Sequence, residues 1–314
     1  MKYTAIILNA VLTVALCCPP EEALYPCVCK KHWGSSYTVD IICDGLHNEI
    51  DLKNAAAACK HRPNILSFVI LNSVLNYIPQ SAFEGTFIKI IEVQESTLFS
   101  LSDTEQALVG MEKTLESLTL IKNIFMGSWH WSKLKSLTKM NHLKVREISL
   151  PSIEKDIDSL SFLRNVDFSK NEISWISDQA FENFKNLESL VLGENEIKEV
   201  KRNMFPNPAS QLRIMNFTQN RIQALPTDMF DNMPRLTAFH IKNNRLLTLD
   251  EKVFASVWSQ LFFIDINDND LRCDCRMSWM MQRKFPLLTL GLCSEPPELR
   301  GKNITMLSVK DLWC

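Results

Sequence analysis

The sequence predicts an α/β repeat solenoid, in which short strands from successive repeats stack into a parallel sheet and disulfide-linked caps close both ends. Two observations lead to this prediction. Residues 163–271 repeat one pattern of apolar residues every 24 or 25 positions. Six of the ten cysteines lie at positions 17–59 and four at positions 273–314, whereas residues 60–272 contain none. The cysteines therefore lie where a repeat array needs closing.

The composition of the 314-residue chain argues against several functions. Lys and Arg number 34 and Asp and Glu number 36, so the net charge is −2. We therefore expect neither nucleic-acid binding nor attraction to an anionic membrane. The chain has only 8 glycines, which disfavours the glycine-rich loops that bind phosphate groups and dinucleotides. The hydrophobic share of 46% is that of a folded protein rather than a disordered one.

The N-terminus has the features of a secretory signal peptide. One lysine precedes an apolar run at residues 5–16, which is too short to span a bilayer but suits a signal peptide. Ala15 and Cys17 are the small residues expected before a cleavage site at Cys18, so residues 1–17 are the predicted signal peptide. A buried N-terminal strand or helix is the alternative. No later run is long enough to span a bilayer and no apolar tail ends the chain, so we expect a secreted, extracellular protein without a membrane anchor.

The repeat is clearest in the second half of the chain. Its copies start at Leu163, Leu187, Leu212, Leu236 and Leu261. Asparagines follow eight residues after each start, at Asn171, Asn195, Asn220, Asn244 and Asn269, and phenylalanines follow the first four starts, at Phe181, Phe205, Phe230 and Phe254. The alternating apolar residues after each start predict a short strand with one buried face. The asparagine amide falls where the chain leaves the strand and is suited to satisfy buried backbone groups.

This pattern, L-x-x-L-x-L-x-x-N-x-L, resembles that of leucine-rich repeats. It extends less regularly toward the N-terminus, with starts at Leu66, Ile88, Leu115 and Val145, which gives about nine repeats over residues 66–269. The resemblance implies a leucine-rich-repeat horseshoe whose parallel sheet lines the concave face. The outward side chains of that sheet would then form the surface for a protein partner.

The two cysteine clusters resemble the caps of extracellular leucine-rich-repeat proteins, through CPPEEALYPCVC with VDIIC and NDLRCDCRMSW with two later cysteines. An oxidising compartment makes disulfides the default for these cysteines, and zinc binding is the alternative for the closely spaced pairs. The resemblance places an N-terminal cap at residues 18–65 and a C-terminal cap at residues 270–314. It implies the disulfides Cys18–Cys29, Cys27–Cys43, Cys273–Cys293 and Cys275–Cys314.

Cys59 has no partner in this scheme once Cys17 leaves with the signal peptide. Two interpretations remain for its thiol. A buried position would leave it free, whereas an exposed position would allow an intermolecular disulfide through Cys59.

The sequence contains none of the catalytic motifs that we sought. G-x-S-x-G, H-E-x-x-H and phosphate-binding loop patterns are absent, and the 6 histidines are scattered. Asp265, Asn267, Asn269 and Asp270 resemble half of a calcium-binding loop, but the glycine and the closing glutamate of that loop are missing. We therefore expect no enzyme activity, no metal and no cofactor.

These observations together predict a secreted, non-catalytic protein-binding module. The layout of CPPEE…YPCVC, irregular early repeats and a C-terminal cap is also similar to arthropod secreted proteins related to the non-catalytic chain of shrimp luciferase. That resemblance implies a stabilising subunit of a separate secreted enzyme. The alternative is a free-standing extracellular recognition protein in adhesion, guidance or innate immunity.

Two sets of residues are candidate sites. The sequons at Asn216 and Asn303 are predicted glycosylation sites, and the Asn216 side chain is predicted to lie on the concave face. Apolar residues at outward strand positions of the early repeats are predicted to form a partner-binding patch. These residues are Phe68, Ile70, Ile90 and Ile121. The alternative is that the N-terminal cap, or an error in the register of these repeats, buries them.

Overall fold

Two compact units make up the chain, Met1–Ile148 and Ser149–Cys314. The structure is a computed structural model and describes residues 17–35, 37–127 and 130–314. The predicted signal peptide, apart from Cys17, therefore lies outside the described residues. Within the described ranges, no helix has the length and apolar composition needed to cross a membrane.

The first unit begins with a small disulfide-bonded cap. Its elements are helix α2 (Glu21–Leu24), the antiparallel hairpin of β1 (Val28–Lys31) and β2 (Val39–Asp44), and helix α3 (Glu49–Ala58). Helix α3 starts where the Asn48 side chain accepts a hydrogen bond of 2.8 Å from the backbone N–H of Asp51. Disulfides join Cys18 to Cys29 and Cys27 to Cys43, the same pairs that the resemblance implied.

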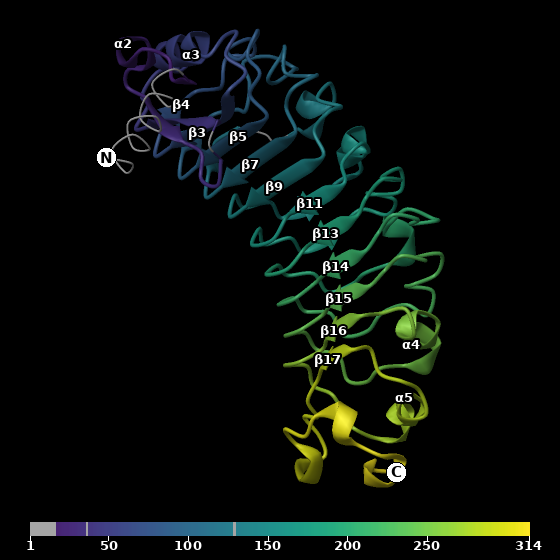
Figure 1. The fold of residues 1–314 in the computed structure, drawn as a ribbon. Coiled ribbons are helices and arrows are strands. Elements are labelled where there is room, and N and C mark those ends of the chain that lie inside the picture. Colours follow the sequence, from purple (N-terminus) through teal and green to yellow (C-terminus); the bar gives the residue numbers. More distant parts are fainter. Residues whose placement is uncertain (1–16, 36, 128–129) are drawn as a thin grey trace, which may run out of the picture. The chain divides into compact units, whose positions relative to one another are not determined.

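A parallel sheet follows in the first unit, with one strand from each repeat lying beside the next (Figure 1). After β2 its strands are β3 (Ile65–Leu71), β5 (Ile90–Gln94), β7 (Ser117–Ile121) and β9 (His142–Arg146). A smaller parallel sheet consists of β4 (Val74–Leu75), β6 (Thr97–Leu98) and β8 (Ile124–Phe125), and a 3-10 helix covers Trp131–Leu134. In β5 and β7 buried residues alternate with half-buried ones, so one face of the sheet packs into the core.

The second unit repeats this arrangement more regularly. Its parallel sheet contains β11 (Asn165–Asp167), β13 (Ser189–Val191), β14 (Ile214–Asn216), β15 (Ala238–His240), β16 (Phe263–Asp265) and β17 (Leu288–Leu290). A small sheet pairs β10 (Ser152–Ile153) with β12 (Trp175–Ile176), and 3-10 helices cover Lys155–Leu160 and Arg202–Met204. Ser189 pairs with Ile214, and Ile214 pairs with Ala238. The sheet register therefore reproduces the spacing of the sequence repeat.

The repeated asparagines hold successive turns of the second unit together. The Asn195 side chain accepts hydrogen bonds from the backbone N–H groups of Asn171 and Ile173 and donates one to the carbonyl of Phe168, all in the preceding repeat. Asn220, Asn244 and Asn269 make the same kind of contacts one repeat further on each time. These buried amides satisfy backbone groups that the turn out of the strand would leave unpaired.

The repeated phenylalanines fill the core of the second unit on the side away from the sheet. The Phe181 and Phe205 rings are stacked with centroids 6.4 Å apart, and those of Phe230 and Phe254 are 5.5 Å apart. Phe239 of β15 and Phe217, which directly follows β14, join this column through edge contacts. Each repeat therefore packs mainly against its neighbours, as expected for a solenoid.

The C-terminal cap closes the second unit. Helix α4 (Glu251–Trp258) belongs to the repeat that precedes β16, and the cap after β16 contains helix α5 (Ser278–Met281) and 3-10 helices at Cys275–Met277, Pro297–Leu299, Ile304–Met306 and Val309–Asp311. The Trp279 indole donates a hydrogen bond of 2.9 Å to the Leu249 carbonyl and packs edge-on against Trp258 at 5.0 Å. Disulfides join Cys273 to Cys293 and Cys275 to Cys314, again the pairs that the resemblance implied.

The structure has a strand for each of the nine predicted repeats, but it shifts two of the early starts. The start predicted at Leu66 lies at Ile65, because Ile65, Phe68 and Ile70 are the buried residues of β3. The start predicted at Val145 lies at Met140, because Leu143 and Val145 are the buried residues of β9.

The corrected register also shows what replaces asparagine in the early repeats. Ser73 and Ser96 take the position after the strand, where both are buried. The Ser96 hydroxyl accepts a hydrogen bond from the backbone N–H of Ser73, and the Asn123 side chain accepts one from the backbone N–H of Ser96. A serine hydroxyl therefore replaces the asparagine amide as the acceptor for a backbone N–H of the preceding repeat.

Candidate protein-binding face

The outward side chains of the first unit's parallel sheet form one part of the candidate site. The strand register aligns them in three rows across the sheet. The rows are Asp40, Ser67, Ile90, Ser117 and His142; then Ile42, Val69, Glu92, Thr119 and Lys144; then Asp44, Leu71, Gln94, Ile121 and Arg146. This face is polar and mixed in charge, with a few apolar residues toward the cap.

The predicted patch was wrong at two of its four residues. Phe68 and Ile70 have exposed fractions of 0% and belong to the core, where the Phe68 ring packs edge-on against Phe83 at 5.0 Å. The one-residue error in the start of this repeat exchanged the two faces of the strand. Ile90 and Ile121 are half-buried and lie on the outer face, in different rows.

The outer face carries apolar residues near the predicted patch, but most of them are not the residues predicted from the sequence. Ile42 pairs directly with Val69 across β2 and β3, and Leu71 and Ile90 occupy the neighbouring rows. All four side chains are half-buried. Neighbouring strands lie about 4.8 Å apart, so these side chains form a compact cluster, which we call the N-terminal cluster.

The outer face of the second unit changes from polar to apolar along the sheet. Asn165 and Asp167 on β11 are polar, whereas the outward positions of β16 and β17 include Phe263, Leu288 and Leu290. The residues just before these two strands are also exposed and apolar. We call Phe262, Phe263, Leu287, Leu288, Leu290 and Leu292 the C-terminal strip.

His240 on β15 adjoins this strip. Its ring lies 4.6 Å from that of Phe263. Burial lowers the pKa of His240, and the nearby Asp265 carboxylate opposes this effect only in part. The imidazole is therefore neutral near pH 7, so the strip has an uncharged neighbour.

The two sequons lie at different kinds of position. Asn216 is half-buried on β14, with its side chain on the outer face. The side-chain oxygen Oδ1 of Asn216 accepts a hydrogen bond of 2.8 Å from the backbone N–H of Thr218. Asn303 begins a 3-10 helix of the C-terminal cap and accepts hydrogen bonds from the backbone N–H and the hydroxyl of Thr305. Glycosylation at either asparagine stays a prediction.

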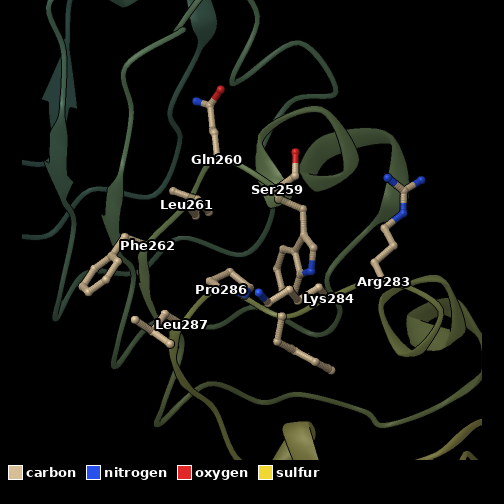
Figure 2. Close-up of a pocket in the computed structure, with 10 residues that line it drawn as sticks. Ser259, Gln260, Leu261, Phe262, Arg283, Lys284, Pro286 and Leu287 are labelled. Atoms are coloured by element: carbon tan, nitrogen blue, oxygen red, sulfur yellow. The ribbon is translucent and has the colours of Figure 1, made fainter.

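A pocket of about 600 Å³ opens beside the C-terminal strip. It lies between the segment that leads from α4 into β16 and the segment that leads from α5 into β17. Figure 2 shows Phe262 and Leu287 near one end and Arg283 at the other. The backbone N–H of Leu288 donates a hydrogen bond of 2.9 Å to the carbonyl of Phe262, which fixes the two segments side by side.

The remaining candidates offer no reactive centre. Cys59 is fully buried, its thiol lies 3.2 Å from the Ala55 carbonyl, and burial raises its pKa to about 12. A disulfide to another chain needs an accessible thiol, so the buried position favours the free thiol over the intermolecular bridge.

Among the described residues no group of three or more His, Cys, Asp or Glu side chains is placed to hold a metal ion. In the half calcium loop, Asp265 instead accepts a hydrogen bond from the backbone N–H of Asn267.

Sequence analysis missed the pocket and most of the C-terminal strip. Of this strip, the repeat that starts at Leu261 predicts only Phe263 as an outward residue. The available signal was the run PLLTLGL at residues 286–292, which has more leucines than one buried strand face needs. The pocket itself depends on two segments that are about 25 residues apart in the sequence and meet only through the register of β16 and β17.

A comparison with protein families agrees with this geometry. The family described as BspA-type leucine-rich repeat region matches residues 152–272 in six copies. Together with the stacked strands and the buried asparagines, this match decides the fold. The chain is a leucine-rich-repeat solenoid with disulfide caps. The fold class predicted from the sequence is therefore confirmed.

Among curated proteins, the chain is similar to the Oplophorus-luciferin 2-monooxygenase non-catalytic subunit of Oplophorus gracilirostris. It is 27% identical to this chain over 205 residues, which are 63% of this chain and 54% of that protein. The chain thus spans about half the length of the curated relative that it matches. The similarity to the non-catalytic chain of a shrimp luciferase, predicted from the sequence, is confirmed at this level.

Solved structures of other leucine-rich-repeat proteins share the fold. A chain in the octameric complex of Latrophilin 3, Unc5D and FLRT2 matches with a TM-score of 0.62 and 20% identity, covering 95% of this chain and 100% of that chain. A chain in the Drosophila Toll–Spatzle complex matches with a TM-score of 0.54 and 17% identity, covering 88% and 51%. At these identities the likeness concerns the fold alone.

Proposed function

We propose that this chain is a secreted, non-catalytic protein-binding module that acts as the stabilising subunit of a separate secreted enzyme. The observation that carries the proposal is the outer face of its parallel sheet, which is the concave face in leucine-rich-repeat proteins. In each unit polar side chains are interspersed there with apolar ones, the N-terminal cluster in the first unit and the C-terminal strip in the second, on strands whose other face already fills the core. Such a mixed surface on a repeat scaffold suits a protein partner.

The role as an enzyme subunit is supported by the relative from Oplophorus gracilirostris, which is named a non-catalytic subunit. Four disulfides support an oxidising, extracellular location. A subunit of this kind stabilises its enzyme by binding the folded form in preference to the unfolded form.

The test is purification of the tagged full-length chain from the secretion in which it occurs, followed by mass spectrometry of what co-purifies. We expect one enzyme in near-equal molar amount. We also expect that enzyme to lose activity faster on warming after the chain has been removed, because its folded state then loses the binding free energy. Co-purification of a receptor without enzyme activity would instead favour the free-standing recognition protein, and a chain that captures no partner would contradict the proposal.

A further inference from the structure

The C-terminal strip exposes an unusual amount of apolar surface for strands at the end of a sheet. Leu287 has an exposed fraction of 71%, Phe262 of 51% and Leu288 of 48%. Phe263 pairs directly with Leu288 across β16 and β17, and Leu290 occupies the next outward position on β17, so these side chains form one continuous surface. Soluble proteins seldom leave such a patch in water unless it binds another molecule.

The pocket beside the strip combines apolar walls with positive charge. Apart from Ser259 and Gln260, its lining consists of apolar side chains and two cations, Arg283 and Lys284, and it includes no acidic residue. Figure 2 shows Arg283 on the side of the pocket away from Phe262 and Leu287, and Lys284 between them with its side chain extending toward Pro286.

The two cations differ in how far the protein itself neutralises them. Arg283 donates a hydrogen bond of 3.0 Å to the Glu251 carboxylate and lies 5.6 Å above the ring of Trp279. Lys284 is exposed, and in the part of the chain that the structure describes it has no carboxylate within ion-pair distance. Lys284 therefore offers its ammonium group to an anion from outside the chain.

From this combination we infer that the pocket and the C-terminal strip bind an acidic, apolar segment of the partner protein. An aromatic or branched aliphatic side chain of that segment enters the pocket beside Phe262 and Leu287. A neighbouring carboxylate pairs with Lys284, and further apolar side chains lie on Leu288 and Leu290. This inference rests on the proposed function, because it assumes that the partner is a protein, and it adds the place and the chemistry of the contact.

The experiment selects peptides from a random library displayed on phage, using the full-length chain as bait. We expect enriched sequences to contain an aromatic or aliphatic residue with Asp or Glu close by. One such peptide is then synthesised with a fluorescent label, and its affinity for variants of the chain is measured. Leu287→Ser and Lys284→Glu should each weaken binding by about tenfold or more, because the first removes apolar contact and the second reverses the charge.

A matched control separates the local charge from the overall charge. Lys310→Glu makes the same exchange at an exposed lysine of the C-terminal cap that does not line the pocket, and it should leave the affinity unchanged. All three positions are exposed, so the variants should fold normally, and circular dichroism checks this.

Three results would overturn the inference. The first is enrichment of peptides without acidic residues, and the second is an equal loss of peptide affinity for Lys284→Glu and Lys310→Glu. The third is saturable binding of laurate, a small apolar anion used as a probe, with no peptide enriched, which would indicate a small-molecule pocket. Capture of the natural partner distinguishes this failure from that of the proposed function. If the Lys284→Glu and Leu287→Ser chains capture the partner as well as the unchanged chain does, the proposed function stands and the inference fails.

Discussion

At the scale of single residues, the repeated asparagine side chains satisfy buried backbone groups of their own and of the preceding repeat. Asn195 makes five hydrogen bonds to buried backbone groups, two as acceptor and three as donor. Asn195→Ala removes these hydrogen bonds from buried backbone groups, so we expect the free energy of unfolding to fall by roughly 2–4 kcal/mol. Denaturant unfolding measures this, with the exposed Asn186→Ala as the control that should change little. Equal stability of the two variants would contradict this role.

The buried thiol of Cys59 gives a second prediction at this scale. Burial raises its pKa to about 12, so at pH 8 the native thiol is almost entirely protonated and inaccessible. Since the thiolate is the reactive form, iodoacetamide at pH 8 should not modify the native mature chain. It should add one label to the non-reduced chain in guanidinium, as intact mass shows.

The same measurement tests the cysteine assignments. A Cys59→Ser chain should take up no label in either condition if cleavage precedes Cys18. Rapid labelling of the native chain at Cys59 would contradict the buried position and restore the intermolecular disulfide as an interpretation.

At the scale of elements, the register of β3 can be tested by two neighbouring substitutions. Phe68→Asp places a carboxylate in the core and should cost several kcal/mol, enough to prevent secretion. Val69→Asp places the same group on the outer face, so the chain should be secreted in normal amount. Immunoblots of medium and cell extract measure both, and the opposite pattern would show that the register first predicted from the sequence holds after all.

The later strands were predictable because three kinds of residue recur together. Leucine, asparagine and phenylalanine keep fixed offsets from Leu163 onward, so any shift of one residue would break all three patterns. In β3 the run ILSFVIL is apolar at nearly every position and carries little information on which face is buried. The asparagine that would have settled the register is replaced by Ser73, whose hydroxyl serves the same turn.

The candidate site was predictable in kind but only partly in position. A parallel sheet of alternating residues predicts an outer face, and most of its residues in the second unit followed from the repeat. The exposure of Leu287 and Phe262, by contrast, depends on how the loops before β16 and β17 pack. Loop packing of this kind follows from three-dimensional contacts that a repeat pattern does not specify.

At the scale of the whole molecule, a glycan on Asn216 would divide the binding surface. Asn216 lies on β14, near the middle of the second unit's sheet, whereas the C-terminal strip begins two strands away on β16. We expect glycopeptide mapping to find Asn216 occupied and Thr218→Ala to remove that glycan alone. Partner binding at the C-terminal strip should survive in both forms, because the glycan covers neighbouring strands only. An unoccupied Asn216 beside an occupied Asn303 would leave the middle of the sheet open to the partner.

The asparagine contacts also have a direction, which matters while the protein is being made. Each asparagine serves the backbone of the repeat before it, from Asn195 to Asn269. A chain leaves the ribosome N-terminus first. The backbone N–H groups of the newest repeat therefore lack their asparagine acceptor until the next repeat has been synthesised. The last one is completed by the C-terminal cap, where the Ser294 hydroxyl donates to the carbonyl of Asn269. Nascent chains that stall before the cap therefore keep one unfinished turn at their growing end, whatever their length.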